Sequence, residues 1–501
     1  KSLLFLADQN GDEQNQVYLM NVSTGDIMAL TANFEVQYYL GEFSPDGKKV
    51  AFAGNDRVPT EQDVIIYDLA SGERTTLTGI GILFAANWSP NGRYMTVLNA
   101  KSNTNVDVML YDVQTGELTN LIPHDDETIY APGPWAHDSS GFYLMTNVGR
   151  EFTGMGFYKI QDKTWEWVET PDHDIENVVL AHNAPVLVWS VNDNGASKLF
   201  ACDLNTHEAL NMPKFPVGVI GGINIAPSGD RLALVFARPG EASNLYEFNL
   251  KTGELKALGQ SMLGRIDPAD MVEPELVYYE TFDGRKIPAW LYKPKVGVGQ
   301  APYPVVLSIH GGPEAQERPG YAYSGFYQYL LNRGFGVLAP NIRGSTGYGI
   351  TYQKLIHRDW GGAELKDIEH AAKYLQSLDW VDNNRLAVYG GSFGGFATLS
   401  AITRLPQYWA CAVDLVGPAN LLTFVKAVPP TWRRIMKEWV GDPEEDYDLL
   451  VERSPITYVD QIRAPLLVIQ GANDPRVVKA ESDQMVERIR SNGGSVKYYV
   501  D

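Results

Sequence analysis

The chain has 501 residues, which indicates two or three domains, and its composition, 44% apolar and 20% charged, is typical of a folded globular protein. Its formal net charge of −20 argues against nucleic acid or an anionic membrane as a partner, because both would repel such a surface. No apolar run approaches the length that spans a bilayer, and no secretory signal is visible. We expect the two cysteines, Cys202 and Cys411, to be buried free thiols in a reducing cytosol.

The first half of the chain repeats one pattern, an apolar strand, a polar turn and a second strand, about every 45 residues. The clearest copies are VYLMNVSTGDIMALT, VIIYDLASGERTTLT, VMLYDVQTGELTNLI and LYEFNLKTGELKALG, and two weaker ones are FYKIQDKTWEWVET and LFACDLNTHEALNM. A second element, such as SPDGKKVAF, precedes most copies. These repeats predict the blades of a β-propeller. Six are visible, and the first lacks the element that would precede Lys1, so we expect an incomplete blade and seven blades in the complete domain.

From about Met262 the rhythm changes, and short apolar runs alternate with helical stretches. The segment YYETFDGRKIPAWLYKP predicts a hairpin that turns at Asp283-Gly284. After it, continuous apolar strands separated by helices indicate a largely parallel sheet with both faces covered. We therefore predict a propeller over residues 1–262 and an α/β domain over residues 263–501.

The stretch GGSFG at residues 390–394 stands between a predicted strand, RLAVY, and a predicted helix. A serine on such a turn is typical of a nucleophile elbow, in which the strained turn pushes the hydroxyl out above the sheet. The positive end of the following helix then faces the point where negative charge develops. We predict that Ser392 is a nucleophile; the alternative is an ordinary strand-to-helix turn with a serine at the helix N-cap.

Two other segments fit this chemistry. The stretch LSIHGGP ends a strand where such folds place an oxyanion-hole loop, so we predict that the Gly312 N–H and the Phe393 N–H stabilise an oxyanion. His310 precedes the elbow in sequence, and we interpret it as a packed residue that braces this loop. The stretch IQGANDPRV ends another strand, and its Asp474 is placed to orient a catalytic imidazole. The alternative is an Asp-Pro turn residue.

A repeated β-structure followed by HGGP, NIRGSTGYG, YGGSFGGF and GANDPRV, in this order, resembles the prolyl oligopeptidase family of serine peptidases. The resemblance covers nearly the whole chain. It implies a propeller that caps an α/β-hydrolase domain, with an active site that admits short peptides and excludes folded proteins. Histidine in HGGP is similar to the acylaminoacyl peptidases, whereas prolyl oligopeptidases proper and dipeptidyl peptidases carry tyrosine at this position. The adjacent glutamates with which dipeptidyl peptidases anchor a free amine are not found before residue 262.

The resemblance also implies substrate-binding residues. Arg476 matches a family arginine that holds a substrate carbonyl, although a surface salt bridge is an equal alternative. Trp432 and Ile435, with Val477 opposite, are expected to line an apolar pocket for the residue before the scissile bond; the alternative is plain core. No metal or cofactor motif is present, so we expect none, and the expected partners are short peptides, with self-association left open.

The catalytic base is missing from the expected place. The chain has eight histidines, and none follows Asp474, although the order of this triad is Ser, then Asp or Glu, then His. We therefore expect the catalytic histidine shortly beyond Asp501. The leading hypothesis is a serine peptidase that forms an acyl-enzyme on Ser392 and acts on short peptides, with the release of N-acylated residues left open. The alternatives are a carboxylesterase of the same fold and a catalytically dead scaffold.

Overall fold

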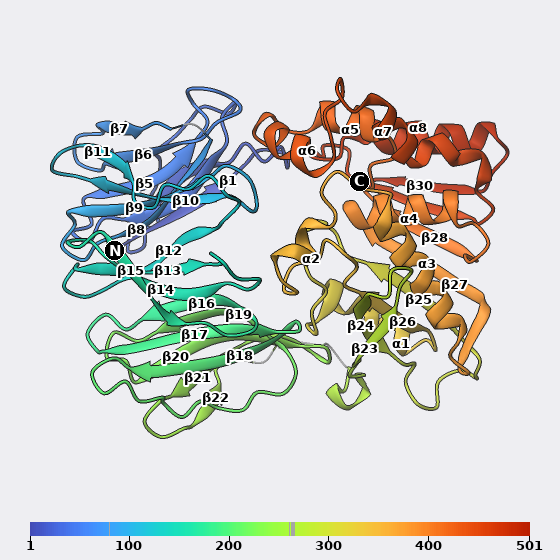
Figure 1. The fold of residues 1–501 in the computed structure, drawn as a ribbon, viewed down its shortest axis with the longest axis horizontal. Helices are drawn as coiled ribbons and strands as arrows, with labels where there is room; N and C mark the ends of the chain where they lie inside the picture. The colour runs from blue at the N-terminus through green and yellow to red at the C-terminus, as the bar shows by residue number, and fades with distance from the viewer. Residues whose placement is uncertain (80, 260, 262–265) are drawn as a thin grey trace. The chain divides into compact units, whose positions relative to one another are not determined.

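The computed structural model describes residues 1–79, 81–259, 261 and 266–501 (Figure 1). The chain forms two compact units. The first unit consists of Lys1–Trp189, Cys202–Glu208 and Pro429–Ile435, and the second of Ser190–Ala201, Ala209–Val428 and Met436–Asp501. The predicted boundary between residues 262 and 263 lies outside the described residues.

Strands that are consecutive in the sequence form six small sheets in the first half of the chain. The first three sheets are β1 (Ser2–Ala7), β2 (Gln16–Asn21) and β3 (Ile27–Ala29); β4 (Tyr38–Phe43), β5 (Lys49–Gly54), β6 (Asp63–Asp68) and β7 (Arg74–Leu77); β8 (Ile82–Trp88), β9 (Tyr94–Ala100), β10 (Val106–Asp112) and β11 (Glu117–Asn120). The next three are β12 (Tyr130–Trp135), β13 (Gly141–Thr146), β14 (Gly154–Lys159) and β15 (Thr164–Glu169); β16 (Asp174–Leu180), β17 (Val186–Asp193) and β18 (Ala196–Asp203); β19 (Val219–Ile225), β20 (Arg231–Arg238), β21 (Glu241–Asn249) and β22 (Leu255–Ala257).

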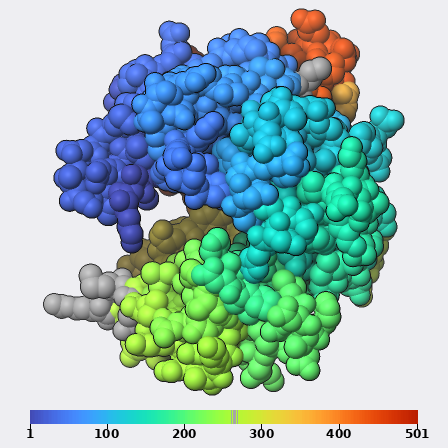
Figure 2. Space-filling view, turned by 90° about the vertical axis from the view of Figure 1, so that its left-hand side faces the viewer, coloured from blue at the N-terminus to red at the C-terminus, as the bar shows by residue number. Residues whose placement is uncertain are grey.

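These six sheets are the blades of a β-propeller, which confirms the predicted fold of the first half. Within the first unit, the opening strand of each blade contacts the opening strand of the next, from β1 to β4, β8, β12 and β16. Figure 2 shows these blades side by side in chain order, from blue to teal. The expected seventh blade stays a prediction.

The repeated sequence pattern has a local cause in the hairpin turns of the blades. In four turns a glycine with φ of 73° to 76° donates its N–H to the carbonyl oxygen of an Asn or Asp four residues earlier: Gly25 to Asn21, Gly72 to Asp68, Gly116 to Asp112 and Gly253 to Asn249. The weaker copies make the same turn without glycine, since Lys163 and His207 have φ of 54° and 59°. Their N–H groups donate to Lys159 and Asp203. The turn geometry is therefore the same in the two copies that lack the glycine.

The second half contains one eight-stranded sheet in the order β23-β24-β26-β25-β27-β28-β29-β30. The first two strands are antiparallel to their neighbours and form the predicted hairpin, and the six strands from β26 to β30 are parallel. The strands are β23 (Glu275–Glu280), β24 (Lys286–Tyr292), β25 (Tyr303–Ile309), β26 (Gly336–Pro340), β27 (Val381–Gly391), β28 (Cys411–Leu415), β29 (Leu466–Gln470) and β30 (Val496–Val500). This sheet and its helices form the α/β-hydrolase domain.

Helices join and cover these strands. They are η1 (Pro268–Asp270), η2 (Ala322–Gly325), α1 (Phe326–Leu331), α2 (Ile350–Lys354), α3 (Ala363–Gln376), α4 (Phe393–Arg404), α5 (Leu421–Ala427), η3 (Pro430–Trp432), α6 (Arg433–Trp439), α7 (Tyr447–Arg453), η4 (Pro455–Gln461) and α8 (Lys479–Ser491). Buried side chains of α1 pack on β24, β25, β26 and β27 in one aromatic cluster. Helices α3 and α4 contact each other and the strands β25 and β27, as Figure 1 shows. None of the helices in the described part of the chain has the length and hydropathy needed to cross a membrane.

Both cysteines are free, but the expectation that they are buried is wrong. Cys202 lies near the end of β18 and is only partly covered, and Cys411 is the first residue of β28 and is exposed. Position at the start of a strand leaves the Cys411 side chain outside the interior of the sheet.

Glycines allow three segments to meet at the carboxyl end of β27. A Cβ on Gly394 would overlap the carbonyl oxygen of Ile309 at the end of β25, and one on Gly390 would overlap the backbone of Gly394. A Cβ on Gly395 would overlap the Asp414 carboxylate on β28. Gly391 is different, because the nearest atom to its Cβ would be the Cβ of Leu415 at 3.6 Å, an ordinary contact.

We predict that Lys163→Gly stabilises the protein by about 0.5–1 kcal/mol, because the left-handed conformation strains a residue with a Cβ more than it strains glycine. The reverse change in an equivalent turn, Gly116→Ala, should lower the free energy of unfolding by a similar amount; its Cβ would meet no atom within 4 Å, so strain alone would act. Urea unfolding of both variants measures this. A destabilised Lys163→Gly protein would contradict the explanation.

Gly394→Ala should destabilise the second unit by about 3 kcal/mol or more, because the methyl group would collide with backbone that cannot move aside. Gly391→Ala is the matched control three residues away, and it should change stability by less than about 1 kcal/mol. Thermal unfolding followed by circular dichroism compares the two. Equal stability of the two variants would show that β25 and α4 are not in close contact.

Candidate active site

Ser392 occupies the turn between β27 and α4, as the sequence predicts. Its backbone has φ of 56° and ψ of −121°, an unfavourable conformation for a residue with a Cβ, which typically costs about 1–3 kcal/mol. The turn is held because the Ser392 N–H donates to Leu415 O at 2.9 Å and its carbonyl accepts from the Phe396 N–H at 3.0 Å. Ser392 is exposed, whereas Phe393 and Phe396 are buried. The strained turn therefore presents the hydroxyl to solvent.

The loop after β25 adjoins this serine. A Cβ on Gly311 would lie 3.5 Å from the Ser392 Cβ, so the two backbones are neighbours. Gly312 follows with φ of 121° and is exposed. In the adjacent strands, Ile309 of β25 pairs with Gly390 of β27, which places both loops at the same edge of the sheet.

His310 fixes the orientation of that loop. Its ring is buried, with Nδ1 2.7 Å from Gly311 O and Nε2 2.8 Å from the Ser345 hydroxyl, and burial lowers its pKa. A carbonyl only accepts, so Nδ1 of the neutral ring carries the proton. The C=O of Gly311 and the N–H of Gly312 belong to one trans peptide and point in opposite directions. The hydrogen bond to Gly311 O therefore turns the Gly312 N–H away from His310.

Phe393 carries the second of the two N–H groups that we predict to stabilise an oxyanion. It is the first residue of α4, where backbone N–H groups have no partner within the helix. Its buried ring packs edge-to-face on Trp360, with ring centroids 4.7 Å apart, and beside Phe396. This packing holds the first turn of α4 while its N–H groups stay free of intrahelical hydrogen bonds.

Asp474 lies in the loop between β29 and α8. Its Oδ1 accepts from the backbone N–H groups of Arg476 and Val477, at 2.9 and 3.0 Å, and the side chain is partly exposed. The strands before Ser392 and Asp474 both pair with β28 in parallel, so their carboxyl ends meet at one edge. The strands β27 and β29 are two strand spacings apart, which is about 10 Å.

The predicted substrate-binding residues are found in different surroundings. Arg476 is exposed, and the Val477 side chain is buried while its carbonyl accepts from the Gln470 amide at 2.9 Å. Trp432 and Ile435 belong to the segment Pro429–Ile435 of the first unit, whereas Ser392 belongs to the second. The roles of all four in binding substrate stay predictions.

The three histidines of the second unit have partners other than the predicted catalytic residues. His310 contacts Ser345, His357 contacts Glu314, and His370 Nδ1 lies 3.0 Å from Glu280 O. The expectation of a catalytic histidine after Asp501 therefore stays a prediction.

Sequence analysis missed one buried carboxylate beside this loop. Glu314, which follows HGGP, accepts hydrogen bonds from the Trp439 indole and the Gln353 amide, each at 2.7 Å, and from His357. These contacts bind the HGGP loop to α2 and α6. The only signal in the sequence is a glutamate next to the motif, and its partners are 39 to 125 residues away.

No group of three or more His, Cys, Asp or Glu side chains in the described residues is arranged to hold a metal ion.

Comparison with known proteins gives a consistent result. Residues 321–501 match the model of the prolyl oligopeptidase family. The chain is 31% identical to dipeptidyl aminopeptidase BIII of Pseudoxanthomonas mexicana, over 99% of this chain and 74% of that protein. It is 28% identical to acylamino-acid-releasing enzyme of Mus musculus, over 41% of this chain and 28% of that protein. The crystal structure of puromycin hydrolase has the same fold, with a TM-score of 0.86 at 20% identity over 99% of this chain and 80% of that one.

The identity to the first of these relatives extends over both the propeller and the hydrolase domain, and the family match falls on the half that carries Ser392 and Asp474. This chain therefore belongs to the prolyl oligopeptidase family of serine peptidases.

Proposed function

We propose that the chain hydrolyses short peptides through an acyl-enzyme on Ser392. The observation that supports this most directly is the exposed serine on a strained turn, with the HGGP loop against its Cβ. In this reaction the Ser392 Oγ attacks the substrate carbonyl, and the resulting oxyanion accepts hydrogen bonds from the Gly312 and Phe393 N–H groups.

The proton of Ser392 must pass to a base and then to the leaving amine, after which water releases the acyl group. We assign Asp474 the task of orienting the imidazole that carries this proton. Both hydrogen bonds that it accepts within the described residues go to Oδ1, so Oδ2 is left for an imidazole N–H. We propose Arg476 as a group that holds a substrate carbonyl.

The name of the relative matched over nearly the whole chain favours peptides with a free N-terminal amine. We propose that such peptides, carrying two or three residues before the scissile bond, are the preferred substrates. Release of N-acylated residues is the second candidate, supported by the HGGP motif and by the partial match to acylamino-acid-releasing enzyme. A carboxylesterase and an inactive scaffold are the remaining alternatives.

Ser392→Ala should abolish both turnover and labelling by a fluorophosphonate probe in the natural protein, since loss of a triad serine typically costs about 10⁶ in kcat. Ser400→Ala is a matched control, because Ser400 is a buried serine of α4, the helix that follows Ser392. It should keep both activities. Turnover that persists in Ser392→Ala would exclude this serine as the nucleophile, and a wild-type protein that takes no label would favour the scaffold.

The substrate class can be tested with pairs of peptides that differ only in an N-terminal acetyl group. We expect a higher kcat/KM for the free amine. A higher value for the acetylated member would instead support an acylaminoacyl peptidase. Cleavage of the matching ester without either peptide would identify a carboxylesterase.

A further inference from the structure

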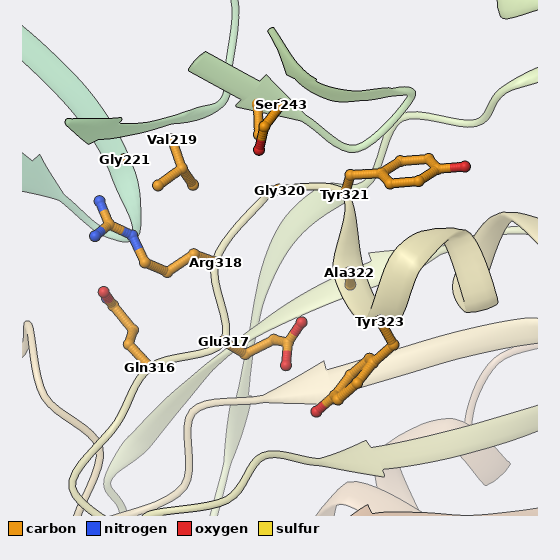
Figure 3. A pocket seen from close by; sticks show the side chains of 11 residues that line it. Val219, Gly221, Ser243, Gln316, Glu317, Arg318, Gly320, Tyr321, Ala322 and Tyr323 are labelled. Carbon is orange, nitrogen blue, oxygen red and sulfur yellow. The ribbon is translucent and has the colours of Figure 1, made fainter. Parts of the chain in front are cut away.

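Among the described residues of the second unit, three buried carboxyl groups have a pKa that burial raises to about 7 or 8. They belong to Glu317, Glu364 and Asp414. Glu317 lines a cavity of about 340 Å³ between the strands β19 to β21 and residues 316–323, and Figure 3 shows its carboxylate directed toward Tyr323. Glu364 belongs to α3. Asp414 lies on β28, next to the strand that leads into the nucleophile elbow.

Asp414 is 1% exposed and is enclosed by backbone. It pairs with Gly390 in the register of β27 and β28, and with Val468 in that of β28 and β29. Its Oδ1 accepts a hydrogen bond from the Gly417 N–H at 3.0 Å. A Cβ on Gly395 or on Gly417 would lie 2.4 or 2.3 Å from the same oxygen. The carboxyl group therefore fills the space between the first turn of α4 and the loop after β28.

The hydrogen bond from Gly417 closes a tight turn over residues 414–417. Val416, inside this turn, has φ of 47°, and the left-handed region is strongly disfavoured for a β-branched residue. Such a conformation typically costs about 1–3 kcal/mol and persists only where the surrounding contacts impose it. The Asp414 carboxyl group supplies one of these contacts, since an aspartate side chain readily accepts from the backbone of its own turn.

The strained turn sets the orientation of one peptide group, which joins Leu415 to Val416. Its carbonyl, Leu415 O, accepts from the Ser392 N–H at 2.9 Å. Its N–H, on Val416, donates to Ile469 O of β29 at 2.9 Å. The C=O and N–H of a trans peptide point in opposite directions, so one rigid group connects the nucleophile elbow with the strand that leads to Asp474.

We propose that Asp414 is a positioning residue for the nucleophile, because its carboxyl group holds the turn that fixes the Leu415–Val416 peptide against Ser392. This role rests on the proposed function, since it affects the reaction only if Ser392 is the nucleophile. Without the carboxyl group, the strain at Val416 is free to relax. The Ser392 N–H then loses the fixed acceptor that holds the elbow.

The charged residues on the elements around Asp414 are bound elsewhere. Helix α4 carries Arg404 in its last turn, and this side chain donates to a backbone carbonyl oxygen at 2.7 Å. On β27, Arg385 forms an ion pair with Asp382 near the start of the strand, and β29 has the uncharged sequence LLVIQ. On β28 itself, Cys411 precedes Asp414 by three residues, so the two side chains lie on opposite faces of the sheet. Burial raises the pKa of Asp414 to about 8, which keeps it neutral at pH 7.

Ionisation of Asp414 should slow catalysis. The carboxyl group of the folded protein loses its proton as the pH rises through about 8. The negative charge then lies against Gly395 in the first turn of α4. There it opposes the charge of the oxyanion that the Phe393 N–H is predicted to stabilise, because both anions compete for the positive end of one helix.

Two substitutions separate the turn from the charge. Asp414→Ala removes the acceptor of the Gly417 N–H, and kcat should fall roughly 10- to 100-fold with KM nearly unchanged, because the nucleophile is misplaced while substrate binding is kept. Asp414→Asn keeps a neutral Oδ1 that accepts the same N–H, so it should restore kcat at pH 7. Wild-type kcat in Asp414→Ala would overturn the positioning role, as would an Asp414→Asn protein as slow as Asp414→Ala.

The pH profile of kcat is a readout that a purely structural carboxyl group would not change. With a pKa of about 8, the neutral fraction of Asp414 falls roughly tenfold between pH 7 and 9, and wild-type kcat should fall with it. Asp414→Asn should lack this fall.

Glu317→Gln is the matched control for the pH profile. Burial raises the pKa of Glu317 to about 8 as well, but its side chain lines the cavity of Figure 3 and not the space beside α4. Whatever its effect on KM, this variant should keep the wild-type fall of kcat. A fall that persists in Asp414→Asn and disappears in Glu317→Gln would overturn the assignment to Asp414.

Amide hydrogen exchange tests the same contacts without any turnover. The Ser392 N–H should exchange faster in Asp414→Ala than in the wild type, and at the wild-type rate in Asp414→Asn. Unchanged exchange at Ser392 in Asp414→Ala would overturn the inference, even if the protein is an active peptidase. Faster exchange that Asp414→Asn reverses would support the hold of Asp414 on the elbow, even if Ser392 proves not to be the nucleophile. If Asp414→Ala does not fold, the pH profile of Asp414→Asn decides alone.

Discussion

Backbone atoms at the carboxyl end of β27 approach their neighbours so closely that a side chain is excluded at three nearby positions. Gly394 lies against the carbonyl of Ile309, Gly390 against Gly394, and Gly395 against Asp414. Ser392 is the exposed residue between these glycines. Its unfavourable φ is maintained because the tightly packed segments on both sides fix the backbone of the turn. The position of the hydroxyl relative to α4 and to the HGGP loop follows from this packing.

The HGGP loop is held by two contacts of its own, one made by His310 and one by Glu314. His310 fixes the carbonyl of Gly311, and the buried Glu314 binds the indole of Trp439. Such support is needed because Gly311 and Gly312 are conformationally free. Without it the Gly312 N–H would adopt many orientations. Charged hydrogen bonds in a buried setting are stronger than neutral ones, so Glu314 is well suited to this task.

Features with a local cause were predictable from the sequence. Blade turns follow from an Asn or Asp and a glycine four residues apart, and the elbow follows from small residues around Ser392. Partners distant in sequence were not predictable. Glu314 meets Trp439 after 125 residues, and Glu317 acquires its burial from the fold around it, so neither carries a motif. Local pattern was weaker at Lys163 and His207, two exposed residues whose hairpin turns hold a left-handed conformation that their side chains disfavour. The choice between family branches rested on the HGGP motif and on the lack of adjacent glutamates before residue 262, and these two local signals weigh less than identity over the whole chain.

Three polar side chains of the hydrolase half, Gln316, Arg318 and Gln328, form hydrogen bonds with residues of the propeller half. The Asn192 amide donates to Gln316 at 2.7 Å, Arg318 binds the turn after β17, and the buried Gln328 donates to Pro239 O at 3.0 Å. Residues 190–201 and the blade β19–β22 therefore belong to the same compact unit as the hydrolase, although the repeat pattern assigns them to a different domain. In evolutionary terms, exchange of the propeller for another one would break these hydrogen bonds, which are buried or partly buried. A replacement blade would therefore have to supply the same partners to Gln316, Arg318 and Gln328.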